Sequence, residues 1–191
     1  MVVDENRVKS ELEKVGIFIN DIYDLVNTRD PYPLAVPVLL DLLKEGIEHH
    51  GTKEGVVRAL AVKDAIGKAS PILIAEYNRV PKDRMTLRWA IGNTVYTTIT
   101  SDDVDSILPI VKDQKNGISR QMFVAALGKV ESEEAEDALI ELLDDEEVTP
   151  HALEALGRMK SKKAREKIAT LTSHSKPLIR KEALKALRKI S

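Results

Sequence analysis

The sequence of 191 residues contains no cysteine, which excludes disulfide bonds, thiol catalysis and cysteine metal sites. Aromatic residues make up only 4% of the chain, so the core must be built from Leu, Ile, Val and Ala, which favours closely packed helices. The longest apolar stretch, Leu34 to Leu40, is far too short to span a membrane. Residues 1–14 lack the basic start and apolar run of a signal peptide. We therefore expect a cytoplasmic protein.

Charge is distributed unevenly along the chain. The formal net charge is only −2, which argues against a general nucleic-acid binder. However, Glu131 to Gly157 contains eleven acidic residues and no Lys or Arg, whereas Arg158 to Ser191 contains twelve Lys or Arg and two Glu. Such blocks are usually solvated helix faces. They could also bind partners of opposite charge, or the two neighbouring blocks could attract each other.

A short motif recurs along the chain. A small residue, an aliphatic residue and a glycine follow one another at Ala65-Ile66-Gly67, Ala90-Ile91-Gly92, Ala126-Leu127-Gly128 and Ala155-Leu156-Gly157. A fifth copy, Ala186-Leu187-Arg188, lacks the glycine. The aliphatic positions lie 25, 36, 29 and 31 residues apart, which is the spacing of a repeated helical hairpin.

Each triplet is typical of a helix end. The small residue allows a neighbouring helix to approach, and the aliphatic residue enters the core. Glycine commonly adopts the left-handed conformation just past a helix C-terminus, so we expect positive φ at Gly128 and Gly157. New helix starts follow: Ser132 is a candidate N-cap before acidic residues, and Ser70-Pro71 and Thr149-Pro150 place proline in the first turn.

Arginines accompany the triplets. Arg84, Arg120 and Arg180 each lie eight residues before the third position of a triplet, and Arg58 lies nine residues before one. These residues could form a ladder of anion-binding groups. We favour the alternative that each arginine packs its stem between repeats and pairs with an acid of a neighbouring repeat.

The apolar periodicity predicts helices throughout the chain. We place them near residues 6–27, 33–46, 53–67, 70–79, 82–97, 102–114, 117–128, 133–144, 149–158, 161–172 and 176–190. Residues 94–100 have strand-like content but no partner strand, so we interpret them as a frayed helix end and a loop.

The pattern resembles HEAT repeats, especially the short repeats named for phycobilisome lyases. The stretches SRQMFVAALGKV, TPHALEALGRMKS and LIRKEALKALRKI are similar to first helices of that family, and EEAEDALIELLDDEEV is similar to a second helix. The resemblance implies an all-α, right-handed α-α superhelix of about five hairpins in a single domain over residues 1–191. Approximate repeats are residues 6–46, 53–79, 82–114, 117–144 and 149–172, followed by a terminal helix at 176–190.

Candidate catalytic groups are few. Some HEAT-like hydroxylases bind di-iron through His-Glu pairs, but no Glu follows any of His49, His50, His151 or His174, so we expect no metal and no cofactor. HEAT-like alkylpurine glycosylases use a basic surface, Trp or Tyr near the lesion, and a catalytic Asp. The nearest counterpart here is the middle cluster of Tyr77, Arg88, Trp89 and Tyr96, although the position of Trp89 before a triplet is typical of a packing residue. A chromophore lyase is disfavoured because no pocket motif is present.

The sequence therefore favours a non-catalytic scaffold, adaptor or regulatory subunit that binds another protein. In such arrays the second helices line the concave binding face. The alternative is nucleic-acid binding through the basic C-terminal repeat, at its sharpest an alkylpurine glycosylase. We predict a candidate interaction surface formed by Arg180, Lys181, Lys185, Arg188, Lys189, Glu141, Asp144, Asp145, Glu146 and Glu147.

Overall fold

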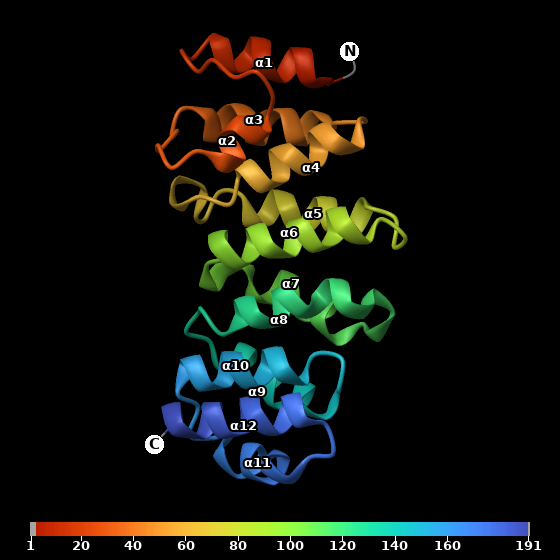
Figure 1. Cartoon of the computed structure of the whole chain (residues 1–191), viewed down its shortest axis with the longest axis vertical. Coiled ribbons are helices and arrows are strands. Elements are labelled where there is room, and N and C mark those ends of the chain that lie inside the picture. The colour runs from red at the N-terminus through yellow and green to blue at the C-terminus, as the bar shows by residue number, and fades with distance from the viewer. Residues whose placement is uncertain (1–2, 191) are drawn as a thin grey trace. The chain divides into compact units, whose positions relative to one another are not determined.

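The computed structural model describes residues 3–190. They belong to two compact units, residues 1–98 and residues 99–191, each of which is described by itself. In each unit the helices follow one another in chain order and pack in two layers (Figure 1). The all-α fold of stacked hairpins predicted from the sequence is confirmed within each unit, while the single domain stays a prediction.

Unit 1 contains three consecutive helix pairs. Its helices are α1 (Glu5–Glu13), α2 (Tyr23–Asn27), α3 (Ala35–Glu45), α4 (His50–Ala59), α5 (Ser70–Arg79) and α6 (Met85–Thr98), with the short 3₁₀ helix η1 (Lys63–Ala65). One layer consists of α2, α4 and α6, and the other of α1, α3 and α5. We call α4 and α6 first helices, and α3 and α5 second helices.

Unit 2 repeats this arrangement. Its first helices are α8 (Gln121–Leu127), α10 (Thr149–Met159) and α12 (Pro177–Ile190), and its second helices are α7 (Val104–Lys112), α9 (Glu133–Glu141) and α11 (Arg165–Thr170). The connections include the 3₁₀ helices η2 (Ser101–Asp103), η3 (Gln114–Arg120), η4 (Leu142–Asp144) and η5 (Leu171–Ser173). The first helices α8, α10 and α12 pack consecutively.

Two predicted helices differ from the structure by more than four residues at one end. The prediction of one helix over residues 6–27 is wrong, because a turn at Gly16, with φ of +79°, separates α1 from α2. The helix expected at residues 53–67 ends at Ala59, so the first triplet lies in η1 and the turn after it. Residues 94–98 are helical rather than frayed, since Thr94 and Thr98 are buried and donate hydrogen bonds to carbonyls one turn earlier.

The predicted conformation of Gly128 and Gly157 is wrong. Gly128 has φ of −72°, and Gly157 lies within α10 and is absent from the positive-φ residues. Their role is close packing between first helices. A Cβ added to Gly128 would lie 2.5 Å from Ala155 Cα, and one added to Gly157 would lie 3.0 Å from Ala186 Cα. Glycine is therefore required at position 128, because the next first helix approaches too closely for a side chain, whereas at position 157 a Cβ would fit only if Ala186 moved slightly.

Candidate functional site

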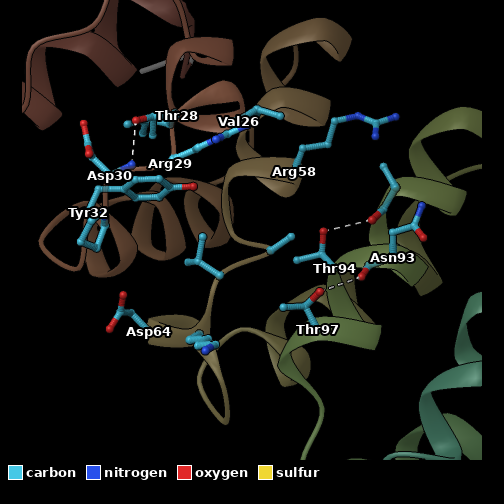
Figure 2. A pocket seen from close by; sticks show the side chains of 16 residues that line it. Val26, Thr28, Arg29, Asp30, Tyr32, Arg58, Asp64, Asn93, Thr94 and Thr97 are labelled. Atoms are coloured by element: carbon cyan, nitrogen blue, oxygen red, sulfur yellow. Dashed lines mark hydrogen bonds between the residues drawn. The ribbon is translucent and has the colours of Figure 1, made fainter.

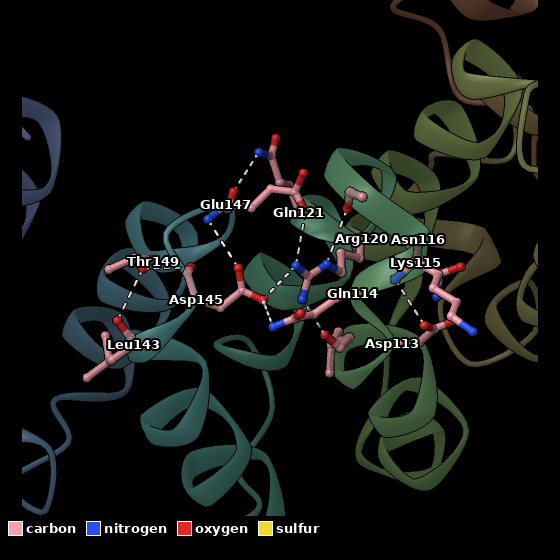
Figure 3. Close-up of polar contacts among 12 residues, drawn as sticks. Asp113, Gln114, Lys115, Asn116, Arg120, Gln121, Leu143, Asp145, Glu147 and Thr149 are labelled. Atoms are coloured by element: carbon pink, nitrogen blue, oxygen red, sulfur yellow. Dashed lines mark hydrogen bonds and ion pairs between the residues drawn. The ribbon is translucent and has the colours of Figure 1, made fainter.

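Arg120 joins two consecutive repeats of unit 2 (Figure 3). Its side chain is 1% exposed and donates to the carbonyls of Val111, at the end of α7, and Gly117. Nη2 also donates to Asp145 Oδ2 at 2.6 Å and to Glu147 Oε2 at 3.0 Å. Burial opposes the charge of Arg120, but the hydrogen bonds and charges of the two acids outweigh it and raise the pKa of the guanidinium.

Residues at equivalent positions perform a similar task in other repeats. Arg88 Nη1 donates to the carbonyls of Tyr77 and Val80 at 3.0 and 2.9 Å, at the end of α5. Arg180 Nη1 donates to the carbonyls of His174 and Ser175, after η5. Each arginine therefore satisfies carbonyls left without a partner where a second helix ends. The sequence predicted Arg84 as the member of this series in α6, but Arg84 is exposed. The prediction is therefore wrong, and Arg88, four residues later, takes this position.

Thr149 takes the place of arginine in α10. Its hydroxyl donates to the carbonyls of Leu143 and Asp145 at 3.2 and 2.7 Å, just after the second helix α9 and η4. Thus the first turn of a first helix binds the end of the preceding second helix at four places. Among the predicted arginines, only Arg120 both packs between repeats and pairs with acids of the neighbouring repeat. Arg180 binds carbonyls instead, and Arg58 pairs with Glu54 of its own helix.

The acidic half of the predicted interaction surface is engaged within unit 2. Asp145 and Glu147 bind Arg120. The other three acids form ion pairs with cations of other helices or turns: Glu141 with Lys112, Asp144 with Lys167, and Glu146 with Lys176. The charge of Lys176 and its hydrogen bond lower the pKa of Glu146. The acidic and basic blocks thus attract each other, one of the two possibilities open from the sequence.

The basic half is divided along α12. Arg180 is half-buried against carbonyls, Lys185 pairs with Glu182 at 3.3 Å, and Arg188 Nε donates to the carbonyl of Leu184. Lys181 and Lys189 are exposed and form no ion pair with any described residue. They lie at opposite ends of α12, so the structure does not gather the five cations into one site.

The middle cluster predicted from the sequence consists of two buried residues and two that are at least partly exposed. Tyr77 is 1% exposed and Arg88 is 3% exposed, with the guanidinium carbon 3.8 Å from the centre of the Tyr77 ring. This buried cation–π contact leaves neither side chain available to hold a base. Trp89, predicted as a packing residue, is 41% exposed, and Tyr96 is half-buried.

Four side chains mark the outer face of α6. Met85, Trp89, Asn93 and Tyr96 are spaced by four, four and three residues and each is at least partly exposed. This spacing places them on one side of the helix. We call this set the α6 face. The sequence did not reveal the α6 face, because the triplet Ala90-Ile91-Gly92 lies one helix turn before the position that is equivalent to the triplets of unit 2.

A pocket of unit 1 lies beside the α6 face (Figure 2). It has a volume of about 690 Å³ and is lined by the ends of α2 and α4, the residues that follow them, and one side of α6. Figure 2 shows Asn93, Thr94 and Thr97 of α6 across from Tyr32. The Tyr32 hydroxyl donates to the carbonyl of Ala59 at 2.8 Å, and burial raises the pKa of this phenol. A smaller pocket of about 300 Å³ lies between the N-terminal halves of α4 and α6 and includes Met85.

Unit 2 has a pocket of its own at the C-terminal ends of its first helices. It has a volume of about 560 Å³ and is lined by Gly128, Lys129, Val130, Glu131, Arg158 and Met159. Burial and the nearby charge of Arg158 lower the pKa of Lys129.

Residues 3–190 contain no group of three or more His, Cys, Asp or Glu side chains that could hold a metal ion. His49 caps α4 by accepting from the amide of Thr52, whereas Nδ1 of His151 is buried without a hydrogen-bond partner. No helix among the described residues is both long and apolar enough to pass through a membrane.

Comparisons with known proteins agree with this architecture. The profile of the PBS lyase HEAT-like repeat matches residues 119–145. No match was found among curated proteins. Two engineered proteins solved by the Northeast Structural Genomics Consortium have similar structures. One has a TM-score of 0.58 and 18% identity, over 96% of this chain and 98% of that chain. The other has a TM-score of 0.53 and 17% identity, over 96% of both chains. The predicted resemblance is therefore confirmed: this is an all-α helical repeat protein with a HEAT-like repeat of the PBS lyase type at residues 119–145.

Proposed function

We propose that the chain is a non-catalytic recognition module that binds another protein through the α6 face and the pockets on either side of it. The observation that carries this proposal is the exposure of Trp89, the single tryptophan, at 41% on a regular helix face. A large aromatic side chain left in solvent forgoes the favourable burial available to it in the core. Tryptophan, tyrosine and methionine are also enriched at protein interfaces, where tryptophan is often an energetic anchor.

The neighbouring surface supports a protein ligand. Met85 contributes to the smaller pocket and Asn93 to the larger one, so the α6 face connects two concave regions. Between them, Arg58 pairs with Glu54 on α4 at 2.8 Å and gives a polar border. Apolar anchors beside pockets with a polar border are the usual composition of a recognition surface. The proposal uses first helices rather than the second helices suggested by the HEAT resemblance.

Nucleic-acid binding has less support. The aromatic and basic residues expected to hold a base include Tyr77 and Arg88, which are both buried. Asp30 and Asp64 line the larger pocket together with Arg29, Arg58 and Lys63, so this pocket is not a purely cationic surface.

The cytoplasmic location stays a prediction.

Affinity capture from a native lysate, with and without nuclease, tests the proposal. Trp89→Ala should remove nuclease-resistant partners without a large loss of stability, because the side chain is partly solvated. Phe18→Ala is the matched control, since Phe18 is an aromatic residue of unit 1 that is 79% exposed and lies between α1 and α2. With a captured partner, the emission of Trp89 should shift to shorter wavelength on binding. Partners that survive Trp89→Ala and Met85→Ala, or that disappear with nuclease, would contradict the proposal.

A further inference from the structure

The connection between α7 and α8 contains the dipeptide Asn116-Gly117 (Figure 3). The chain has six asparagines, and Asn116 is the one that precedes glycine. The other five precede residues with larger side chains, which are Arg7, Asp21, Thr28, Arg79 and Thr94. The dipeptide lies in unit 2 and the α6 face in unit 1, so a reaction at Asn116 goes beyond the function proposed above.

A glycine that follows asparagine exposes the side-chain amide to attack by the main chain. The nitrogen of the following residue can reach the amide carbon when no side chain crowds it, and glycine has none. Gly117 has φ of +56°, and among the described residues a Cβ built on it would meet only Glu147 Oε1, at 3.9 Å. Asn116 and Gly117 are both partly exposed, so water also reaches this turn.

The Asn116 side chain caps the end of α7. Its Nδ2 donates to the carbonyl of Ile110 at 3.0 Å, one of the last four carbonyls of the helix, which have no partner within it. Attack by the Gly117 nitrogen requires the amide to swing toward the main chain, so this hydrogen bond has to open first. The cap therefore slows the reaction in the folded chain, and local opening of the turn permits it.

We propose that Asn116 is a site of spontaneous deamidation, whose products disconnect the end of α7 from the turn that leads to α8. The nitrogen of Gly117 forms a bond to Cγ of Asn116, the Cγ–Nδ2 bond breaks, and the side-chain nitrogen leaves as ammonia with the proton of the Gly117 amide. Water then opens the resulting cyclic imide at either carbonyl. Opening at Cγ gives aspartate, and opening at the main-chain carbonyl gives isoaspartate.

Both products remove the cap. Each lacks Nδ2 and therefore the donor to the Ile110 carbonyl, and aspartate places a carboxylate near this oxygen, where two acceptors repel each other. Isoaspartate also lengthens the main chain by one carbon and converts the former Asn116 carbonyl into the free carboxylate. That carbonyl accepts from Ser119 at 2.6 Å, and the carbonyl of Gly117 accepts from Arg120 Nε at 3.3 Å. Isoaspartate should therefore disturb Arg120 more than aspartate does.

Peptide mass mapping of the full chain during incubation at mildly alkaline pH tests the reaction. The mass increase of an amide-to-acid conversion is expected at Asn116 and not at Asn20, which is exposed but precedes Asp21. A synthetic peptide of residues 113–120 should react about fivefold faster than the folded chain, because it lacks Ile110 and with it the hydrogen bond that restrains the amide. The chain unfolded in urea should react at the rate of the peptide.

Thermal denaturation tests the consequence. The converted protein, separated by ion exchange, should unfold about 3 °C below the unconverted protein, the shift expected for one lost hydrogen bond in a chain of this size. Asn116→Asp reproduces the aspartate product and should shift the midpoint similarly. Asn116→Gln is the matched control: it keeps an amide, but its ring closure is much slower, so its midpoint should not change during incubation.

Three results would each overturn the proposal. They are an intact Asn116 in the folded chain after the peptide has reacted completely, conversion of Asn20 before Asn116, and equal midpoints before and after conversion. A midpoint that falls equally fast in Asn116→Gln would also overturn it, because the loss would then arise elsewhere. Asn116→Gln leaves Trp89 unchanged, so partner capture through the α6 face can succeed or fail independently.

Discussion

The two units place their first helices in contact by different means. In unit 2, Gly128 and Gly157 allow α8, α10 and α12 to approach closely at equivalent positions. In unit 1, the hydroxyl of Thr94 on α6 donates to the carbonyl of Val57 on α4 at 2.9 Å. The recognised repeat lies in unit 2, and the pocket lined by Tyr32 and Asn93 lies in unit 1. The comparison teaches that small residues bring first helices of unit 2 into close backbone contact, whereas in unit 1 a polar side chain bridges α4 and α6 beside a pocket.

The largest expected effect concerns the buried arginines. Arg120→Ala should lower the free energy of unfolding by about 3 kcal/mol, because it removes a buried charge and leaves two acids without their partner. Arg88→Ala should cost about 2 kcal/mol, since it mainly leaves carbonyls unsatisfied. Urea denaturation followed by circular dichroism measures both. Arg84→Ala, at an exposed position, should change stability by less than about 0.5 kcal/mol. A larger effect at Arg84 than at Arg88 would contradict the corrected register.

The close helix contact provides the next prediction. Gly128→Ala should destabilise by about 2 kcal/mol, because the new Cβ would meet backbone atoms of Ala155. Gly157→Ala should cost less, since its nearest atom is 3.0 Å away rather than 2.5 Å. Gly51→Ala in α4 is the control: its Cβ would meet only the His49 side chain, and alanine favours the helix. Equal urea midpoints for Gly128→Ala and the wild type would show that α8 and α10 can separate freely.

The polar contact in unit 1 should contribute less. Thr94→Val removes the hydrogen bond to Val57 and should cost about 1 kcal/mol, the net value of one buried hydrogen bond. The emission of Trp89 reports this loss during urea denaturation, because Trp89 lies on the same helix. Thr97→Val is the matched control, as this half-buried hydroxyl bonds only within α6, to Asn93. If both variants cost the same, the bond between α4 and α6 does not hold the helices together.

The smallest effect is a pH dependence confined to unit 2. Burial lowers the pKa of His151, opposed by the charge of Glu154. A histidine with a depressed folded-state pKa binds protons more readily when unfolded, so stability should fall as pH drops below about 6.5. His151→Gln should reduce this loss between pH 7 and pH 5, as measured by thermal denaturation. An unchanged pH profile in the variant would assign the loss to other groups.

Local signals in the sequence predicted much of the fold. Ser132 caps α9 by accepting from the amide of Ala135 at 3.1 Å, and α5 has the predicted bounds of residues 70–79. These features depend on neighbouring residues and on apolar periodicity, both of which can be recognised in the sequence alone. The long helix at residues 6–27 was predicted wrongly because its apolar residues continue across the turn at Gly16.

The candidate site depended on tertiary contacts that periodicity could not reveal. Arg84 and Arg88 differ by four residues, close to one helix turn, so both fit the same apolar stripe. Only the positions of the Tyr77 and Val80 carbonyls identify Arg88 as the buried residue. The misassigned turn also made Trp89 look like a packing residue. Similarly, the sequence located Gly128, but only the position of Ala155 explains it.

The capping of each second helix by the next first helix has a consequence for dividing the chain into fragments. A piece that stopped at Lys112 would contain all of α7 but lack Arg120, which binds the Val111 carbonyl. The same holds for a piece that stopped before Thr149. The smallest self-sufficient module is therefore not one hairpin. It is a hairpin together with the first turn of the next first helix. Consecutive structural modules of this chain therefore share residues at their boundaries.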